Sequence, residues 1–142
     1  MSDKYFIDTN IVVYSFDPND QRKQNIAREL IQNALQDQTG CISTQVIQEF
    51  LNVSTRKFKP PLSHPDSLRY LNAVLAPLCE VFTSLDLLRR TIEVSERWQY
   101  SLYDSMIITA ALQANCAALY SEDLQHGQQI ESLAIVNPFL AA

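Results

Sequence analysis

The stretch YFIDTNIVVY (Tyr5–Tyr14) begins like a buried β-strand and is then interrupted by three polar residues. Asp8, Thr9 and Asn10 follow one another, with apolar, β-prone residues on both sides. Two interpretations fit this pattern. The three residues can cap a helix that begins directly after them, because Asp, Thr and Asn are favoured at helix N-termini. Alternatively, Asp8 is a ligand held at the tip of a strand, and this stretch alone does not decide between the two.

Outward from this stretch, short apolar runs alternate with helical patterns along the rest of the chain. Strands are expected at residues 5–7, 40–43, 80–82, 117–120 and 133–136, and helices at residues 21–36, 45–58, 66–76, 86–98 and 103–115. The prolines of residues 59–65 predict a loop, and Pro77 is expected to end the helix before it. Strands separated by helices predict an α/β fold, here a three-layer α/β/α sandwich with a parallel sheet of about five strands. We expect one domain that covers residues 1–142.

The composition is that of an ordinary globular protein. Of the 142 residues, 46% are hydrophobic and 19% are charged, which excludes a disordered chain. No apolar stretch approaches the roughly 20 residues that cross a bilayer, so we expect no membrane segment. Acidic and polar residues interrupt the N-terminal stretch, which does not resemble a signal peptide, and a cytoplasmic location is expected. Cys41, Cys79 and Cys116 form no C-x-x-C pair and are expected to be reduced, buried thiols.

The net charge of −5 argues against a protein that grips nucleic acid through a basic surface. That objection weakens if several of the acids bind metal ions. Without four ligand carboxylates, the charge of the remaining residues is −5 + 4 = −1. The composition therefore permits a nucleic-acid enzyme without indicating one.

Four acidic residues are placed by the expected topology near one edge of the sheet. Asp8 and Asp123 follow strands. Glu49 lies in the helix after the second strand, and Asp104 begins a helix whose next residues are apolar. Right-handed crossovers put the strand ends that precede helices along one edge, where ligands of such sheets bind. Taken singly, each acid also has a local explanation as a helix cap, a first-turn acid or a solvated side chain.

As a set, the four acids indicate a metal site. Carboxylates packed together repel one another and raise one another's pKa, so a protein keeps them together only for cations. Oxygen ligands without His or Cys suit Mg²⁺ or Mn²⁺ rather than zinc. These ions serve phosphoryl chemistry, and the pattern therefore predicts phosphodiester hydrolysis.

Four segments, in order, resemble the motifs of the PIN-domain ribonucleases, especially the VapC-like toxins of prokaryotic toxin–antitoxin pairs. They are FIDTNI (Phe6–Ile11), ISTQVIQEFLNV (Ile42–Val53), YSLYDSMIITAAL (Tyr100–Leu112) and LYSEDLQHGQQIESLAIVNPF (Leu119–Phe139). Together they span nearly the whole chain. The departures are small: Ser105 stands where alanine is common, and Ser121 replaces a threonine while keeping a hydroxyl.

The resemblance implies a PIN-domain fold and a metal-dependent endoribonuclease, in which a metal-bound water attacks the phosphorus in line. Thr9 and Asn10 would shape the site, with Asn10 as hydrogen-bond partner of a ligand acid or a water. Ser121 would hold the acid of the first motif by a hydrogen bond, and Glu122 would contribute less than its neighbour. The catalytic acids, which would bind Mg²⁺ or Mn²⁺, would be Asp8, Glu49, Asp104 and Asp123.

The resemblance also implies three partners: an RNA substrate, a cognate antitoxin protein and a second copy of the chain. An arginine of the antitoxin, inserted among the four acids, would satisfy the same carboxylates as a cation. A homodimer would use an apolar stripe formed by Tyr70, Leu71, Val74 and Leu75.

Other classes of protein carry an Asp at a comparable strand tip. A haloacid-dehalogenase-like phosphatase needs a second acid two residues later, where Asn10 stands, and a downstream lysine, whereas no lysine follows Lys59. A receiver-like phosphoacceptor also needs a late lysine. A PIN-like scaffold that binds RNA or protein without cutting, and a solitary RNA-processing nuclease without an antitoxin, both remain open.

Overall fold

The central strand of the sheet is β1 (Tyr5–Ile7), which is buried along its whole length. The structure is a computed structural model and describes residues 3–140. Strands β2 (Gly40–Ser43) and β4 (Ala118–Tyr120) flank β1 and run parallel to it. The sheet continues with β3 (Cys79–Val81) beside β2, and with β6 (Leu133–Val136) and β5 (Gln129–Ile130) beside β4. In the described range the order is β3-β2-β1-β4-β6-β5, and β5 at the edge runs antiparallel to β6.

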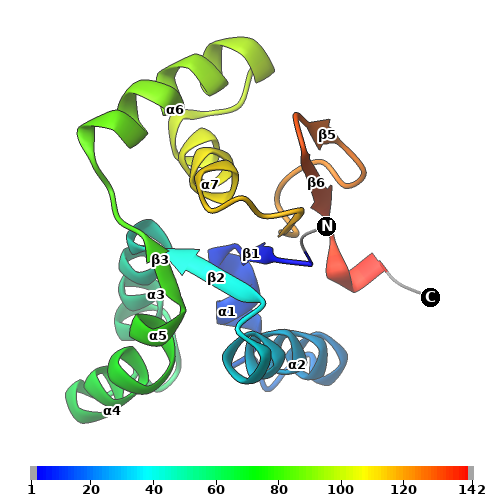
Figure 1. The fold of residues 1–142 in the computed structure, drawn as a ribbon. Coiled ribbons are helices and arrows are strands. Elements are labelled where there is room, and N and C mark those ends of the chain that lie inside the picture. The colour runs from blue at the N-terminus through cyan, green and yellow to red at the C-terminus, as the bar shows by residue number, and fades with distance from the viewer. Residues whose placement is uncertain (1–2, 141–142) are drawn as a thin grey trace.

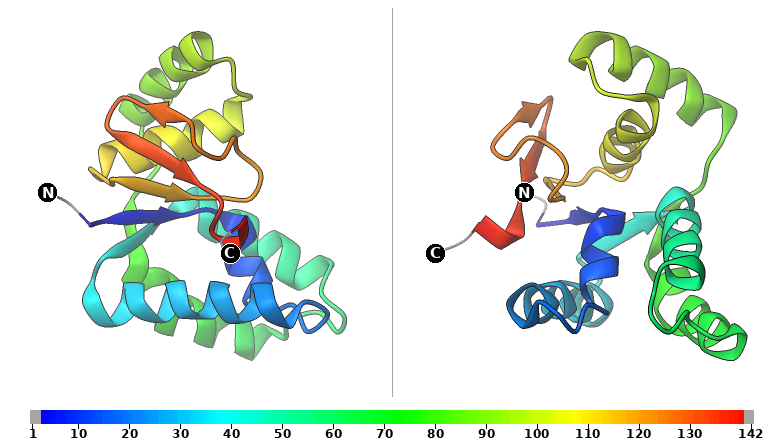
Figure 2. Two further views of the ribbon diagram at one scale, coloured as in Figure 1. Left: turned by 90° about the vertical axis from the view of Figure 1, so that its right-hand side faces the viewer. Right: turned by 180° about the vertical axis from the view of Figure 1, so that it is seen from behind.

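Helices cover both faces of this sheet, as Figure 1 and Figure 2 show. One face carries α1 (Thr9–Tyr14), α2 (Gln21–Asp37), α3 (Thr44–Arg56), and the continuous helical segment formed by α4 (His64–Tyr70), η1 (Leu71–Leu75) and α5 (Ala76–Leu78). The other face carries α6 (Leu85–Trp98) and α7 (Leu102–Gln113). A short 3-10 turn, η2 (Pro138–Leu140), follows β6. The predicted three-layer α/β/α sandwich is therefore confirmed.

The core is densest where helices meet the central strands. Residues Ser105–Ala111 of α7 are all buried, because this helix lies between the sheet and α6. Its buried hydroxyls are accommodated locally, since Thr109 Oγ1 donates to the Ser105 carbonyl at 2.7 Å. On the other face, Gly40 allows α2 to approach β2: a Cβ there would lie 2.5 Å from the Ala34 Cβ.

Three sequence predictions about the elements are wrong in detail. The sheet has six strands instead of about five, because the two-residue β5 is too short to show a strand pattern. The helix expected from residue 66 begins at His64, since Ser63 caps it and Pro65 is tolerated in a first turn. Pro77 does not end this segment, which runs to Leu78. The widened π-helical turn η1 ends at Leu75, two residues before Pro77, which has no amide hydrogen for an ordinary α-helical turn.

The order of the strands places a topological switch point at the carboxyl ends of β1 and β4. The chain passes from β1 to β2 on one side, and the later strands β4 and β6 are added on the other side. A point where the strand order reverses in this way is where α/β sheets bind ligands. Asp8 follows β1 and Ser121 follows β4, so both lie at this point.

The cysteine prediction is largely confirmed. All three cysteines are free thiols, and Cys41 and Cys116 are buried with their sulfurs 3.6 Å apart. Cys79 is only half-buried. Among residues 3–140, no helix has the length and apolar character that crossing a bilayer requires.

Candidate active site

Asp8 lies at the tip of β1 and has one of the two roles that its sequence position suggested, that of a helix cap. It is buried, with 7% of its surface exposed, and it is the N-cap residue of α1. One carboxylate oxygen accepts a hydrogen bond from the Thr9 amide at 2.7 Å. The other accepts from Ser121 Oγ at 2.7 Å and from Asn10 Nδ2 at 3.3 Å. The strand tip therefore holds a carboxylate that also caps a helix.

The electrostatic environment of Asp8 opposes its ionisation. Burial raises the pKa of the Asp8 carboxyl from 3.8 to about 6, although the hydrogen bonds from Ser121 and the Thr9 amide lower it. The negative charges of Glu49 and Asp123 raise the same pKa further. Glu49 and Asp123 are thus near enough to act on Asp8, which is the repulsion expected of a cation site.

Asn10 and Ser121 connect Asp8 with Asp123. Asn10 Nδ2 lies 3.1 Å from Asp123 Oδ2 and 3.3 Å from Ser121 Oγ. The Asp123 amide donates to Ser121 Oγ at 3.2 Å, and Ser121 is completely buried. Two of the three supporting residues inferred from the sequence therefore lie between the first and last acids and connect them.

Glu49 is oriented by one side chain from α1 and one from its own helix. Thr9 Oγ1 donates to Glu49 Oε1 at 2.5 Å, and Gln45 Nε2 donates to Glu49 Oε2 at 3.2 Å. Gln45 Nε2 also donates to the Tyr103 carbonyl at 3.0 Å, in the first turn of α7. Gln45 thus links the Glu49 carboxylate to the segment that carries Asp104.

Asp104 stands apart from the other acids. It lies in the first turn of α7, and its amide donates to Ser101 Oγ, the helix cap, at 3.3 Å. Within residues 3–140, its carboxylate makes no hydrogen bond or ion pair with a side chain. It is the one predicted acid whose charge has no such partner in this range.

The carboxylate oxygens of the four acids are of a kind that binds a hard cation, but the side chains lie too far apart to form a group of three ligands in the described residues. In the described part of the chain, no Lys or Arg forms an ion pair with Asp8, Glu49, Asp104 or Asp123. Oxygen donors with uncompensated negative charge suit Mg²⁺ or Mn²⁺. Over the same range, however, no three His, Cys, Asp or Glu side chains come close enough together to hold a metal ion. The structure brings Asp8 together with Asp123, places Glu49 beside Thr9, and leaves Asp104 at the margin.

Sequence reasoning missed three residues that shape this site: Gln45, Tyr14 and Lys23. Gln45 precedes Glu49 by one helical turn, a spacing that signals a possible side-chain contact. Tyr14 and Lys23 both bind Glu122, the neighbour of Asp123. About a hundred residues of sequence separate them from Glu122, so no local signal reveals these contacts.

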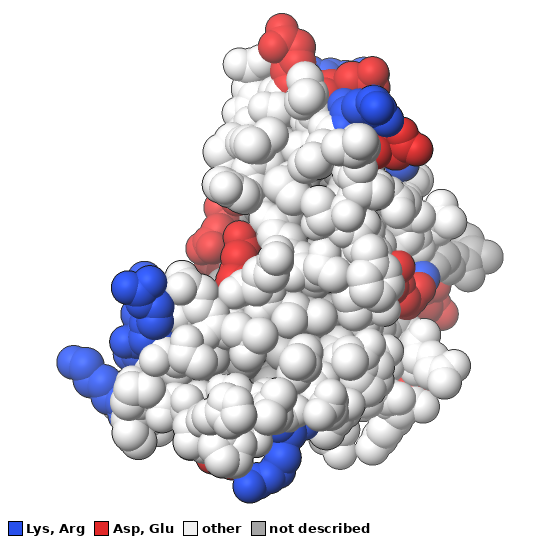
Figure 3. All heavy atoms as spheres, turned by 90° about the vertical axis from the view of Figure 1, so that its left-hand side faces the viewer, with Lys and Arg blue, Asp and Glu red and all other residues white. Residues whose placement is uncertain are grey.

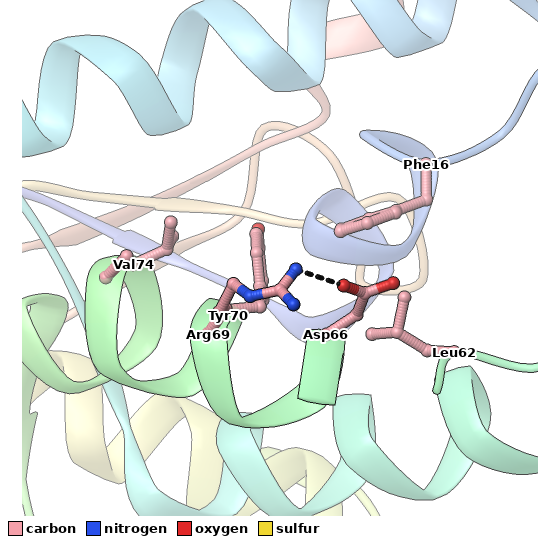
Figure 4. Close-up of a pocket in the computed structure, with 7 residues that line it drawn as sticks. Phe16, Leu62, Asp66, Arg69, Tyr70 and Val74 are labelled. Carbon is pink, nitrogen blue, oxygen red and sulfur yellow. Dashed lines mark hydrogen bonds and ion pairs between the residues drawn. The ribbon is translucent and has the colours of Figure 1, made fainter. Parts of the chain in front are cut away.

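A separate hollow of about 370 Å³ lies beside α4 and the end of α1 (Figure 4). Its walls include the apolar side chains of Phe16, Leu62 and Val74. An ion pair between Arg69 Nη1 and Asp66 Oδ1, at 2.6 Å, lies at its edge. None of the four acids lines this hollow, so it is distinct from the carboxylate site.

Comparisons with known proteins agree with the fold. Residues 5–128 match the family model described as the PIN domain. No curated protein matches the chain significantly by sequence. Among solved structures, the chain is similar to a toxin–antitoxin complex from Klebsiella pneumoniae, with a TM-score of 0.68 and 17% identity over 95% of this chain and 98% of that one.

Two further solved structures show the same likeness. VapC20 of Mycobacterium tuberculosis, a toxin that cleaves the sarcin–ricin loop, gives a TM-score of 0.63 with 18% identity over 84% of this chain and 90% of that one. FitAcB from Neisseria gonorrhoeae gives a TM-score of 0.64 with 16% identity over 96% of this chain and 99% of that one. At these identities the structures support the fold.

Proposed function

Since the chain belongs to the PIN-domain family, we propose that it is a metal-dependent endoribonuclease and the toxin of a toxin–antitoxin pair. The observation that carries this proposal is the network at the ends of β1 and β4. There Asp8 is buried, and neighbouring acids oppose its ionisation. Asp8 and Asp123 share Asn10 and Ser121 as hydrogen-bond partners. A carboxylate kept where ionisation is opposed is expected at a site that binds a cation. The proposed domain is the whole chain, residues 1–142, acting in the cytoplasm.

Asp8, Glu49, Asp104 and Asp123 are the proposed ligands of Mg²⁺ or Mn²⁺. When bound, such an ion lowers the pKa of a water and stabilises charge on phosphate oxygens. The chain's own residues do the positioning. Ser121 and the Thr9 amide hold Asp8, and Thr9 Oγ1 holds Glu49. Asn10, with its Nδ2 shared among three oxygens, keeps Asp8 and Asp123 at a fixed separation.

RNA is the proposed substrate, and its backbone suits a site of this kind. A phosphodiester carries one negative charge, which the four acids would repel in the absence of a cation. Substrate binding should therefore depend on the metal. VapC20, one of the structural neighbours, cleaves the sarcin–ricin loop, which is an observation about that protein. It supports RNA as the class of substrate without naming the target of this chain.

The proposed partners are an antitoxin and a second copy of the chain. Structural neighbours include toxin–antitoxin complexes, which supports the antitoxin.

The stripe predicted for the dimer faces largely inward, because Leu75 is completely buried and Tyr70, Leu71 and Val74 are half-buried. A better candidate surface is the one that carries β3 and the start of α6. Figure 3 shows a broad uncharged area on that side, and Phe82 and Leu85 there are 65% and 68% exposed.

A cleavage assay with two matched variants tests the nuclease. Asp104→Asn removes a carboxylate that has no side-chain partner in the described range, so the fold should be preserved. Asp86→Asn is the control, because Asp86 is also a first-turn acid but pairs with Arg89 on α6. With Mn²⁺ and RNA, wild type and Asp86→Asn should cleave, and Asp104→Asn should not. Equal cleavage by all three proteins would contradict the assignment. If calorimetry then showed no Mg²⁺ or Mn²⁺ binding to wild type, a non-catalytic PIN-like scaffold would be the better description.

The neighbouring reading frame separates a toxin from a solitary RNA-processing nuclease. A small upstream gene that encodes a DNA-binding fold with a disordered tail would support the toxin. Copurification of its product with this chain would be the direct measurement.

A further inference from the structure

Glu122 lies next to the proposed ligand Asp123, but its carboxylate contacts residues of α1 and α2. Tyr14, at the end of α1, donates its hydroxyl to Glu122 Oε1 at 2.7 Å. Lys23, in the first turns of α2, forms an ion pair with Glu122 Oε2. Both charged side chains are only 25% exposed. The ammonium of Lys23 therefore already compensates the charge of the Glu122 carboxylate.

Aromatic rings hold Lys23 in place. Its ammonium lies 4.6 Å from the centre of the Tyr14 ring and 5.3 Å from that of Phe139. The two rings pack edge to face, with their centres 5.1 Å apart. These contacts shield the ion pair from water, which strengthens it relative to an exposed pair.

The backbone of Glu122 is joined to the carboxylate network. Its amide donates to Asn10 Oδ1 at 3.2 Å, while Asn10 Nδ2 contacts Asp8 and Asp123. The segment from Ser121 to Asp123 has no regular secondary structure of its own. Its conformation depends on such cross-links, and the Lys23–Glu122 pair joins it to the long helix α2.

We propose that Lys23, through its ion pair with Glu122, is a positioning residue that fixes Asp123 and Asn10 relative to Asp8. This inference rests on the proposed nuclease function for its consequence, but the positioning itself is a property of the folded chain. The pair also keeps the charge of Glu122 away from the four acids, which already repel one another. Loss of a residue that supports metal ligands typically lowers metal affinity or activity about tenfold to a hundredfold.

The test compares Lys23→Met with a matched control, Lys4→Met. Lys4 also forms a partly buried ion pair, with Glu80 at 2.6 Å and side-chain exposures of 26% and 43%. That pair lies at the opposite end of the strands, since Lys4 precedes β1. Lys23→Arg keeps the charge and should restore function. Glu122→Gln, which keeps the size of the side chain and the contact with Tyr14, serves if Lys23→Met does not fold.

The first measurement does not depend on the nuclease. Without metal, hydrogen–deuterium exchange of the Glu122 and Asp123 amides should be roughly fivefold to tenfold faster in Lys23→Met than in wild type. It should be unchanged in Lys4→Met and in Lys23→Arg. Unchanged exchange in Lys23→Met and Glu122→Gln would overturn the positioning role, whatever the activity of the protein.

The second measurement gives the consequence. The Kd of Mn²⁺, measured by electron paramagnetic resonance, should rise about tenfold in Lys23→Met. At saturating Mn²⁺, kcat should fall while KM for RNA stays constant. Lys23→Arg should return both values to within about twofold of wild type. If Lys23→Met lost stability like Lys4→Met but bound Mn²⁺ like wild type, the role would be structural and the proposal wrong. If wild type neither bound Mn²⁺ nor cut RNA while the exchange difference persisted, the proposed function would fail and the positioning would stand.

Discussion

The charge on Asp8 should destabilise the metal-free protein, and replacing Asp8 by Asn should remove that effect. Burial raises the pKa of Asp8 from 3.8 to about 6. A difference of about 2 pKa units corresponds to roughly 3 kcal/mol of unfolding free energy, at about 1.4 kcal/mol per unit. The shift is upward for an acid, so the folded state binds the proton more tightly than the unfolded chain does. The contribution of protonated Asp8 to stability is complete below about pH 4 and is lost as the pH rises through about 6.

The assay is urea unfolding in the presence of EDTA, followed by circular dichroism at several pH values between 4 and 8. Between these limits, the unfolding free energy of wild type relative to Asp8→Asn should fall by roughly 3 kcal/mol as the pH rises. The pH dependence is the informative quantity. An Asn side chain turns an amide towards Asn10, which also donates, so the variant carries a constant cost of about 1 to 3 kcal/mol.

Asp86→Asn, on the exposed side of α6, controls for the loss of one charge and should follow the wild-type curve. Saturating Mn²⁺ should abolish or reverse the slope seen in wild type, because a nearby cation favours the ionised carboxylate. If the unfolding free energies of wild type and Asp8→Asn changed equally with pH in EDTA, the claim that the fold opposes the ionisation of Asp8 would be refuted.

Four further outcomes are expected. Asp104→Asn should abolish RNA cleavage and leave the melting temperature within about 1 °C of wild type, because its carboxylate has no partner to lose in the described range. Mg²⁺ or Mn²⁺ at a hundred times its Kd should stabilise wild type by about 3 kcal/mol in thermal melts, and zinc dependence would contradict the oxygen-only ligand set. Light scattering at micromolar concentration should report a dimer that Phe82→Glu converts to a monomer; a wild-type monomer would end the dimer claim. Inhibition by the upstream-encoded partner should weaken with added Mn²⁺ and when its inserted arginine is replaced, whereas activity that persists with saturating bound partner would refute this restraint.

The sequence predicted the layers of the fold because its signals are local. Short apolar runs mark β1, β2 and β4, and the loop prolines and helix caps mark the boundaries between elements. Errors occurred where a tertiary context overrides the local rule. Pro77 normally ends a helix, yet the preceding π-helical turn allows the helical segment to continue. The strand β5 exists only because β6 is beside it.

The candidate site was predictable in its residue types and in part of its hydrogen bonding, because the resemblance implied the bond from Ser121 to Asp8 and a bond from Asn10 to an acid. Parallel-sheet topology was sufficient to place Asp8 and Asp123 at one edge. It could not show that Asn10 bridges them, because the orientation of a side chain is not encoded in strand order. The contact between Lys23 and Glu122 was equally hidden, since it depends on how α2 packs beside the end of β4.

The two interpretations of Asp8 turn out to be compatible, because they use different oxygens of the same carboxylate. The oxygen that accepts from the Thr9 amide starts α1, and the other faces Ser121 and Asn10. A carboxylate oxygen has two acceptor positions, so the capping oxygen keeps one of them open. Capping therefore fixes the direction of Asp8 without consuming its capacity to bind a cation. A cap does not require a charged side chain to be buried, whereas Asp8 is 7% exposed and two neighbouring acids oppose its ionisation. The burial and the repulsion, rather than the cap itself, are what favour a functional role for this residue.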